Sequence, residues 1–224
     1  MKVILTAMNI TIVEKEGFEA DDILGTIAKN SQKQGIAVSI VSGDRDLLQL
    51  ADTNIKIRIP KTKKGVTEVE DYYPEDVKEL YGVTPAEFIE MKALMGDTSD
   101  NIPGVPGIGE KTATKIIQEY GSIENAHEHA EEIKPPRASK NLQEYWDQAR
   151  MSKALATIDT HADIRFDVEK AFEGMKHTVM TESMIPWYRG PKTALDDFYH
   201  ENGWFPALHP GEKEEFTEVG PFEQ

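Results

Sequence analysis

Hydrophobic and polar residues follow two different patterns along this chain, and the pattern changes near residue 73. Apolar residues three and four apart predict helices, and short β-branched or continuous apolar runs predict strands. Helices are expected at 2–9, 18–35, 44–51, 74–82, 84–96, 110–121, 122–133 and 142–158, and strands at 10–15, 36–43 and 54–60. The β-α-β-α-β order over residues 10–60 predicts a parallel sheet covered by helices. The nearly continuous apolar run 36–43 is expected to be buried on both faces.

The same change of pattern divides the chain into four expected parts. They are a partial α/β core at 1–73, a helical subdomain at 74–158, a closing segment at 159–208 and an acidic linker or tail at 209–224. Aromatic residues of the closing segment are expected to pack a small helical cap: Trp187, Tyr188, Trp204 and Phe205.

The composition indicates a soluble globular protein. Hydrophobic residues make up 39% of the chain and charged residues 29%, which is not the balance of a disordered chain. No apolar run reaches 18 residues and no signal peptide is recognisable, so no membrane segment is expected. Cysteine is absent, which excludes disulfides and thiolate chemistry and suits a cytoplasmic location.

Charge is distributed unevenly along the chain. The net charge of −15 by itself argues against nucleic-acid binding. Residues 54–64, however, contain five bases and no acid: Lys56, Arg58, Lys61, Lys63 and Lys64. This basic run either contacts a DNA backbone or forms a solvated surface hairpin, and both readings stay open. His127 and His129 are two residues apart in a helical stretch and do not share a face, so no metal is expected between them.

Three groups of acidic residues lie at boundaries of the predicted elements. They are Glu19, Asp21 and Asp22, then Asp44 and Asp46, then Asp97 and Asp100. Each group alone has an ordinary explanation, because acidic residues stabilise helix starts, cap helices or occupy loops. Together, the seven carboxylates would repel one another unless cations neutralised them. Oxygen ligands without cysteine or nearby histidine suit Mg²⁺ or Mn²⁺, and paired divalent ions promote in-line attack on phosphodiesters.

A Gly/Pro-rich segment at 101–109 lies between two predicted helices and indicates a helix-hairpin-helix motif. Its glycines allow the backbone to approach a phosphate closely, and the amides at the start of the next helix face an anion. Two lysines of that helix add positive charge. The residues that carry this prediction are Gly104, Gly107, Gly109, Lys111 and Lys115. The alternative is an ordinary turn between two helices.

Three segments resemble the 5′-nuclease domain of bacterial DNA polymerase I and related flap endonucleases, in order and in spacing. They are GFEADDILGT, VSGDRDLLQL and MGDTSDNIPGVPGIGEKTA. The resemblance covers residues 1–158 well, and 209–224 resembles a linker into the rest of a polymerase. It implies a parallel-sheet 5′-nuclease core followed by a helical helix-hairpin-helix subdomain. The implied activity is that of a metal-dependent 5′-3′ exonuclease and flap endonuclease acting on DNA in replication and repair.

The resemblance also implies roles for individual residues. The carboxylates binding two Mg²⁺ or Mn²⁺ ions would be Glu19, Asp21, Asp22, Asp44, Asp46, Asp97 and Asp100, with Asp21, Asp22, Asp44 and Asp46 acting in catalysis through the metal. The turn at 101–112 would bind duplex phosphates independently of sequence and hold a K⁺ ion. DNA contacts would be made by Gly104, Val105, Gly107, Ile108, Gly109, Lys111, Thr112 and Lys115. The partners would be DNA with a 5′ flap or 5′ end and the rest of a polymerase I chain, in the bacterial cytoplasm at the nucleoid.

The chain also departs from the family pattern at its start. Family members begin with a strand that bears a metal-binding Asp. A second Asp follows on the next strand, and a helical arch comes after it. The start of this chain, MKVILTAMNI, resembles the helix after the arch. The resemblance therefore implies that about the first third of the domain is absent. We expect slow cleavage and an exposed sheet edge that favours self-association. The alternative function is a catalytically inactive module that binds duplex DNA through residues 101–115.

Overall fold

The computed structural model of the chain describes residues 2–7, 10–63 and 66–171. Residues 14–165 form one compact unit, and residues 1–13 with 166–224 form a second. The aromatic cap expected around residues 187–205 and the tail at 209–224 lie outside the described residues. Within the described part, no helix has the length and apolar character needed to cross a bilayer.

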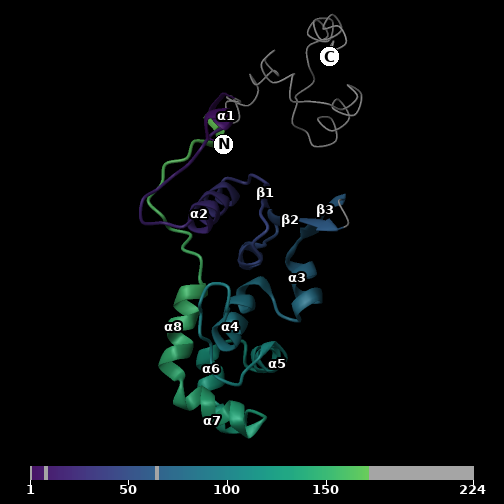
Figure 1. Cartoon of the computed structure of the whole chain (residues 1–224), viewed down its shortest axis with the longest axis vertical. Coiled ribbons are helices and arrows are strands. Elements are labelled where there is room, and N and C mark those ends of the chain that lie inside the picture. The colour runs from purple at the N-terminus through teal and green to yellow at the C-terminus, as the bar shows by residue number, and fades with distance from the viewer. Residues whose placement is uncertain (1, 8–9, 64–65, 172–224) are drawn as a thin grey trace, which may run out of the picture. The chain divides into compact units, whose positions relative to one another are not determined.

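The larger unit contains a three-stranded sheet in the order β1-β2-β3 (Figure 1). β1 (Val38–Val41) and β2 (Ile55–Lys63) are parallel. β3 (Val66–Tyr72) is antiparallel to β2 and was not predicted. Its sequence, VTEVEDY, is rich in acidic residues because these pair with bases of β2 rather than entering the core. The α/β class is confirmed, with a mixed sheet instead of a purely parallel one.

Two expectations for the sheet are wrong. Residues 10–15 form no strand, because a strand needs a hydrogen-bonded partner and the described ladders join only β1, β2 and β3. The run 36–43 was expected to be buried on both faces, yet Val41 is 64% exposed while Ile40 is buried. Ser39 and Val41 lie on one face of β1 and are exposed, whereas Ile40 on the other face is in the core, so only one face of this strand is covered. β1 is also an edge strand, paired only with β2 in the described part of the sheet. The exposed sheet edge is thus present as expected.

The described helices, including the 3₁₀ helices η1 and η2, are α1 (Lys2–Ala7), α2 (Ala20–Lys33), η1 (Asp46–Leu50), α3 (Pro74–Tyr81), α4 (Pro85–Met95), α5 (Glu110–Tyr120), α6 (Ile123–Glu128), η2 (Ala130–Glu132), α7 (Pro136–Glu144) and α8 (Trp146–Ala156). Their ends follow local signals. Thr84 Oγ1 accepts the Glu87 N–H while the Glu87 carboxylate accepts the Thr84 N–H, which forms a capping box at α4. Gly82 and Gly121 adopt positive φ and end α3 and α5.

Three helix predictions differ in detail. The stretch 44–51 is a short 3₁₀ helix rather than an α-helix, and 122–133 is divided between α6 and η2. The stretch 133–140 was expected to interrupt the helices, but α7 begins within it at Pro136. Proline suits the first turn of a helix because its missing N–H would have no partner there.

One continuous core joins the sheet to the helical part of the larger unit. Fully buried side chains of this core include Leu47, Leu48, Ile55, Ile57, Met91, Leu94, Ile117 and Leu142. η1 and α4 both contribute to it, so the acidic residues at the start of η1 and just after α4 are set on a rigid base.

Candidate metal and DNA-binding site

Three acidic side chains from two parts of the chain converge in the structure. Asp46 begins η1, whereas Asp97 and Asp100 lie in the loop after α4. Carboxylate oxygens of these three residues all lie within 4.8 Å of one another. The loop is closed by two backbone hydrogen bonds between Asp97 and Ile102, of 2.9 and 2.7 Å. Asp46 of the second predicted acidic group therefore forms, with both residues of the third group, one cluster that could hold a cation.

The first acidic group lies next to the second. Asp21 is half-buried, and its pKa is raised to about 6, first by burial and then by the negative charges of Asp44, Asp46, Glu19 and Asp22. The negative charge around Asp21 is therefore not fully compensated by the protein. Asp46 acts electrostatically on Asp21 of the first group, and it is also near Asp44 and Asp97. It therefore links all three groups.

Two residues of these groups also have structural roles. Asp44 Oδ1 accepts the N–H of Asp46 at 2.9 Å, an arrangement that stabilises the start of η1. Asp22 Oδ2 accepts the N–H of Glu19 at 3.1 Å, and its Oδ1 accepts the N–H of Asp159 at 2.8 Å. The ordinary explanation, in which acidic residues stabilise helix starts, therefore holds for these two positions; their metal-binding roles stay predictions.

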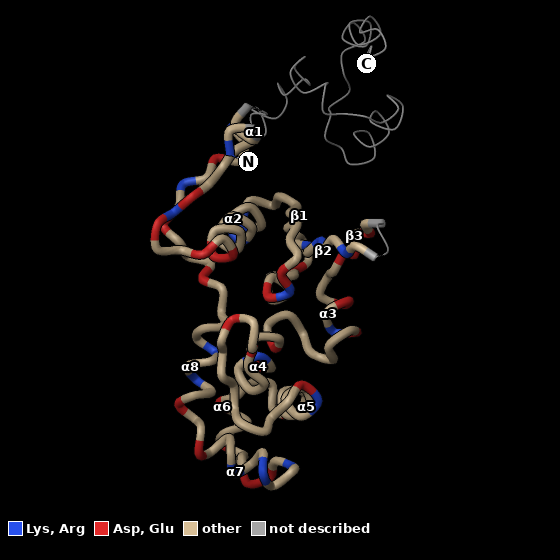
Figure 2. Tube along the Cα trace, in the orientation of Figure 1, with Lys and Arg blue, Asp and Glu red and all other residues tan. Residues whose placement is uncertain are grey.

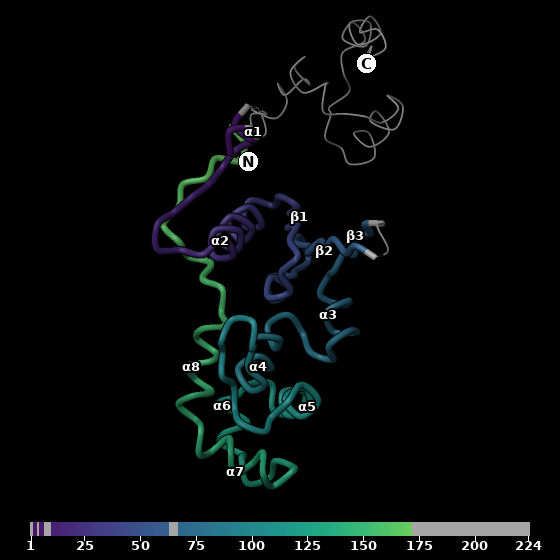
Figure 3. Tube along the Cα trace, viewed as in Figure 1, coloured from purple at the N-terminus to yellow at the C-terminus, as the bar shows by residue number. Residues whose placement is uncertain are grey.

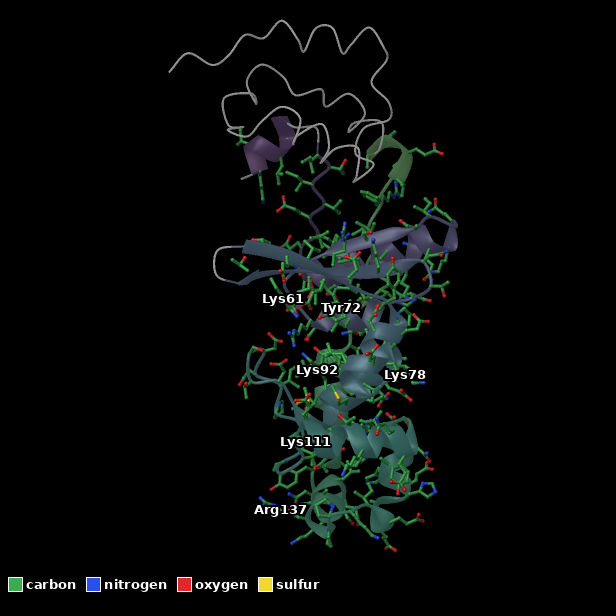
Figure 4. All side chains as sticks on the ribbon, turned by 90° about the vertical axis from the view of Figure 1, so that its right-hand side faces the viewer. Lys61, Tyr72, Lys78, Lys92, Lys111 and Arg137 are labelled. Carbon is green, nitrogen blue, oxygen red and sulfur yellow. The ribbon has the colours of Figure 1, made fainter. Side chains whose placement is uncertain are left out.

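A buried lysine in this cluster was missed by the sequence analysis. The Lys92 side chain is 7% exposed, and its Nζ contacts Asp46 Oδ1 and lies 2.6 Å from Asp97 Oδ2 (Figure 4). Burial lowers the pKa of Lys92, but the bonds to Asp46 and Asp97 outweigh it and raise the pKa overall. The only signal in the sequence is a lysine within the largely apolar helix PAEFIEMKALM.

The two carboxyl partners of Lys92 respond differently. The pKa of Asp97 is lowered to about 2 by hydrogen bonds from Lys92 and Ser99. The pKa of Asp46 is raised, because burial outweighs the stabilising contact with Lys92. Asp97 is therefore a carboxylate at neutral pH, and Asp46 is the member of the pair whose negative charge is less well compensated.

The predicted hairpin residues divide into buried and exposed sets. Gly104 is buried: its N–H donates to Ser152 Oγ at 3.1 Å, and its carbonyl accepts from Gln148 Nε2 at 2.7 Å. Val105 and Ile108 are 2% and 3% exposed and pack in the core. Gly104 therefore supports the hairpin from within, and its N–H is already used, contrary to the close phosphate approach expected there.

The exposed set of hairpin residues comprises Gly107, Gly109, Lys111 and Lys115, with Thr112 partly exposed. A third cation, Arg137, lies beside this set and was not predicted from the sequence. A Cβ on Gly107 would lie 3.1 Å from Arg137 Nε, so this guanidinium of α7 covers the turn. Figure 4 shows Lys111 and Arg137 in the helical part of the chain. Arg137 could not be assigned to the DNA-binding residues from sequence, because residues 133–140 were expected to form an irregular break between helices.

Three bases of the β2 basic run pair with acidic residues of β3, and Figure 2 shows basic and acidic residues along these two strands. Lys56 Nζ and Arg58 Nε lie 3.0 and 2.7 Å from the Asp71 carboxylate, and Lys61 pairs with Glu70. These pairs favour the solvated hairpin over a DNA contact. The histidines are also explained by packing, since His127 stacks on Trp146 and His129 on Tyr120 with ring centroids 4.2 and 5.8 Å apart.

An acidic α/β core joined to a helix-hairpin-helix segment defines a nuclease-type fold. Two models of one family match this chain: the 5′-3′ exonuclease N-terminal resolvase-like domain at residues 1–82, and the 5′-3′ exonuclease C-terminal SAM fold at residues 83–178. The chain belongs to the 5′-3′ exonuclease family.

Similar proteins include bacterial DNA polymerases. DNA polymerase I of Bacillus subtilis (strain 168) is 51% identical over 165 residues, covering 74% of this chain and 18% of that protein. DNA polymerase I of Streptococcus pneumoniae (strain ATCC BAA-255 / R6) is 46% identical over 202 residues, covering 90% of this chain and 21% of that protein. The chain thus spans about a fifth of the length of these relatives.

Two solved structures share the fold. A T5 5′-exonuclease with bound zinc matches with a TM-score of 0.62 and 23% identity, covering 82% of this chain and 62% of that one. A T5 flap endonuclease in a pseudo-enzyme-product complex with DNA and metal ions matches with a TM-score of 0.58 and 22% identity, covering 83% and 62%. At these identities the likeness supports the fold alone.

Proposed function

We propose that this chain hydrolyses DNA phosphodiester bonds at 5′ ends and flaps, using divalent cations held by its carboxylates. The observation that carries the proposal is the convergence of Asp46, Asp97 and Asp100, whose oxygens lie within 4.8 Å of one another. Family membership supports the reaction class. The T5 structures that share the fold are named for bound metal ions and DNA, and the proposal extends this class of cofactor and substrate to the chain.

The residues present fit a divalent cation. The donors are carboxylate oxygens, which suit Mg²⁺ and Mn²⁺. The raised pKa of Asp21 reflects uncompensated negative charge that such an ion would neutralise. When bound, the ions would supply an activated water and stabilise charge on the phosphate. The protein's own contribution is to hold Asp46 and Asp97 in a fixed orientation, through Lys92 and through Ser99, whose N–H donates to Asp97 at 2.8 Å.

The exposed side of the hairpin would bind the DNA backbone. Lys111, Lys115 and Arg137 are exposed and supply positive charge, and α5 begins at this turn, where the start of a helix favours an anion. Phosphate contacts carry no sequence information, so binding would be independent of sequence. A K⁺ ion at this turn, linkage to a DNA polymerase I chain and a cytoplasmic location at the nucleoid remain our predictions.

One observation favours a second function, that of a DNA-binding module without catalysis. Lys92 already places a positive charge between Asp46 and Asp97. An ammonium in that position compensates two of the carboxylates that a metal ion would need. If Lys92 replaces the ion instead of assisting it, the chain would bind duplex DNA without cleaving it.

Cleavage of a fluorescent 5′-flap duplex in Mn²⁺ or Mg²⁺ separates the two functions. We expect measurable cleavage that falls at least about 100-fold in Asp97→Asn, because small changes in metal position are costly. The matched control is Asp147→Asn, whose side chain is 96% exposed on α8. DNA binding without metal-dependent cleavage would support the binding module, and the absence of both Mn²⁺ and DNA binding would overturn the proposal.

A further inference from the structure

The segment 156–162 begins at the last residue of α8 and runs back to the elements that carry the first two acidic groups (Figure 3). It contacts η1 through Gln49 and α2 through Asp22 and Thr26. All of these residues belong to the compact unit 14–165. The contacts consist of directional hydrogen bonds, so they fix the position of the segment along η1 and α2.

The Gln49 side chain forms both bonds on the η1 side. Its Nε2 donates to the Ala156 carbonyl at 3.0 Å, and its Oε1 accepts the Ile158 N–H at 3.0 Å. A carbonyl and an N–H as partners define which end of the amide is nitrogen, so the side chain has one orientation. Gln49 lies three residues after Asp46 in the same short helix, so the amide anchors the element that positions Asp46.

The α2 side is anchored in a similar way. Thr26 is 1% exposed, and its hydroxyl donates to the Asp159 carbonyl at 3.3 Å and accepts the Ala162 N–H at 3.1 Å. Gly25 leaves room for the segment, because a Cβ there would lie 3.0 Å from the Ile158 side chain. The segment therefore lies closely against the helix that begins with Asp21 and Asp22.

The other end of this connection reaches the third acidic group. α8 holds both polar backbone atoms of Gly104 through Ser152 and Gln148. Gly104 in turn packs on Gly96, the residue before Asp97. One continuous element, α8 with residues 156–162, thus contacts the supports of all three acidic groups.

We propose that Gln49 is a positioning residue that sets the distance between Asp46 and the Asp97–Asp100 loop by fixing η1 to the 156–162 segment. The inference rests on the proposed function, because it assumes that these carboxylates bind a divalent cation. Gln49 touches neither cation nor DNA in this role. Its loss would let η1 shift and would separate oxygens that now lie within 4.8 Å.

The test is Mn²⁺ binding to the full chain, measured by electron paramagnetic resonance of free Mn²⁺. Gln49→Met keeps the length of the side chain but removes both hydrogen bonds. We expect its Mn²⁺ affinity to fall about tenfold or more, as for other residues that orient metal ligands. Gln143→Met, at an exposed position of α7, is the matched control and should bind Mn²⁺ like the wild type.

Two further measurements separate positioning from general destabilisation. All titrations are made at a temperature where circular dichroism shows the variants to be fully native, and duplex DNA affinity is measured in chelator. A positioning role predicts weaker Mn²⁺ binding with unchanged DNA affinity. Equal loss of both, or wild-type Mn²⁺ affinity in Gln49→Met, would overturn the inference. Wild-type protein that binds no Mn²⁺ would instead reject the proposed function.

A second pair of variants keeps the test decisive if Gln49→Met does not fold. Thr26→Val removes the hydroxyl that holds the other side of the segment, whereas Thr26→Ser retains it. We expect Thr26→Val to weaken Mn²⁺ binding and Thr26→Ser to restore it. Equal Mn²⁺ affinity in the two folded variants would show that the 156–162 segment does not position the carboxylates.

Discussion

Gly96 and Gly104 pack backbone against backbone. A Cβ on Gly104 would overlap the Gly96 nitrogen, and a Cβ on Gly96 would lie 2.6 Å from the Ile102 carbonyl oxygen. Both residues have a positive φ, which is 74° at Gly96 and 60° at Gly104. Gly96 directly precedes Asp97 and Gly104 begins the hairpin, so this contact fixes the candidate cation loop to the candidate DNA-binding turn.

Replacement of Gly104 by alanine should strongly destabilise the protein. The left-handed backbone costs a non-glycine residue about 1–2 kcal/mol, and the added methyl group in a packed site about 1–3 kcal/mol. We expect a loss of about 3 kcal/mol in urea unfolding. Gly109→Ala is the matched control, because Gly109 has a φ of −96° and no atom within 4 Å of an added Cβ. Similar losses for both variants would show that the Gly96 contact is not tight.

The raised pKa of Asp21 predicts a pH-dependent stability. Its pKa rises from 3.8 unfolded to about 6 folded, so the folded state binds the proton more tightly. The stabilisation that this tighter proton binding gives the folded state is complete below about pH 4, and it is lost as the pH rises through 6. At pH 7.5 without divalent ions, Asp21→Asn should therefore stabilise the chain, by about 1 kcal/mol after allowance for solvent screening. The measurement is thermal unfolding across pH 4–8.

The control for this prediction is Asp147→Asn, which removes a carboxylate that is 96% exposed on α8 and belongs to none of the three acidic groups. Addition of Mn²⁺ should reverse the order, because Asp21 then contributes to cation binding and its loss becomes unfavourable. A stability difference between Asp21→Asn and wild type that does not vary between pH 4 and 7 would contradict the assignment.

Duplex DNA binding should be salt-sensitive and independent of sequence. Lys111→Glu and Arg137→Glu should each weaken binding equally for unrelated sequences and lower the slope of log K against log salt by about one. Arg150→Glu is the control, since Arg150 is an exposed base of α8, two residues from both Gln148 and Ser152 and therefore not on the helix face that holds Gly104. Fluorescence anisotropy at several salt concentrations gives both quantities. A marked preference for one sequence would exclude recognition by phosphate contacts alone.

Local signals in the sequence were sufficient for most of the helical part. Thr84, Gly82 and Gly121 act within one helical turn, so the ends of α3, α4 and α5 could be predicted without knowledge of the fold. β3 could not be predicted in this way. Its acidic residues suit a strand only because Lys56, Arg58 and Lys61 lie opposite on β2, and that pairing exists only once the hairpin forms.

The candidate site shows the same division between local and tertiary information. The acidic groups were recognisable because their residues are adjacent in sequence, and the structure brings Asp46, Asp97 and Asp100 together. One partner of Asp22 is the N–H of Asp159, 137 residues away, and the burial of Lys92 depends on the packing of α4. Neither has a local signature, so sequence reasoning identified the carboxylates but missed what holds them.

Lys92 provides the clearest test of how the carboxylates are neutralised. Removal of one member of a buried ionic cluster leaves the remaining charges uncompensated and typically costs about 3–5 kcal/mol. Lys92→Met should therefore destabilise the chain by this amount in chelator, as measured by urea unfolding. Lys78→Met, at an exposed position of α3, is the control and should have little effect.

The decisive part of this prediction is the response of Lys92→Met to Mn²⁺. Lys92 and Ser99 together hold the pKa of Asp97 at about 2. Without the Lys92 ammonium, the carboxylates of Asp46 and Asp97 repel each other. A divalent cation bound there would replace the lost charge and stabilise the native state by an amount that grows with the logarithm of its affinity. We therefore expect Mn²⁺ to raise the melting temperature of Lys92→Met by more than that of the wild type.

Adding Asp97→Asn to Lys92→Met should recover part of the lost stability in chelator and abolish the response to Mn²⁺. If Mn²⁺ shifts wild type and Lys92→Met equally, Lys92 and the cation do not share these carboxylates.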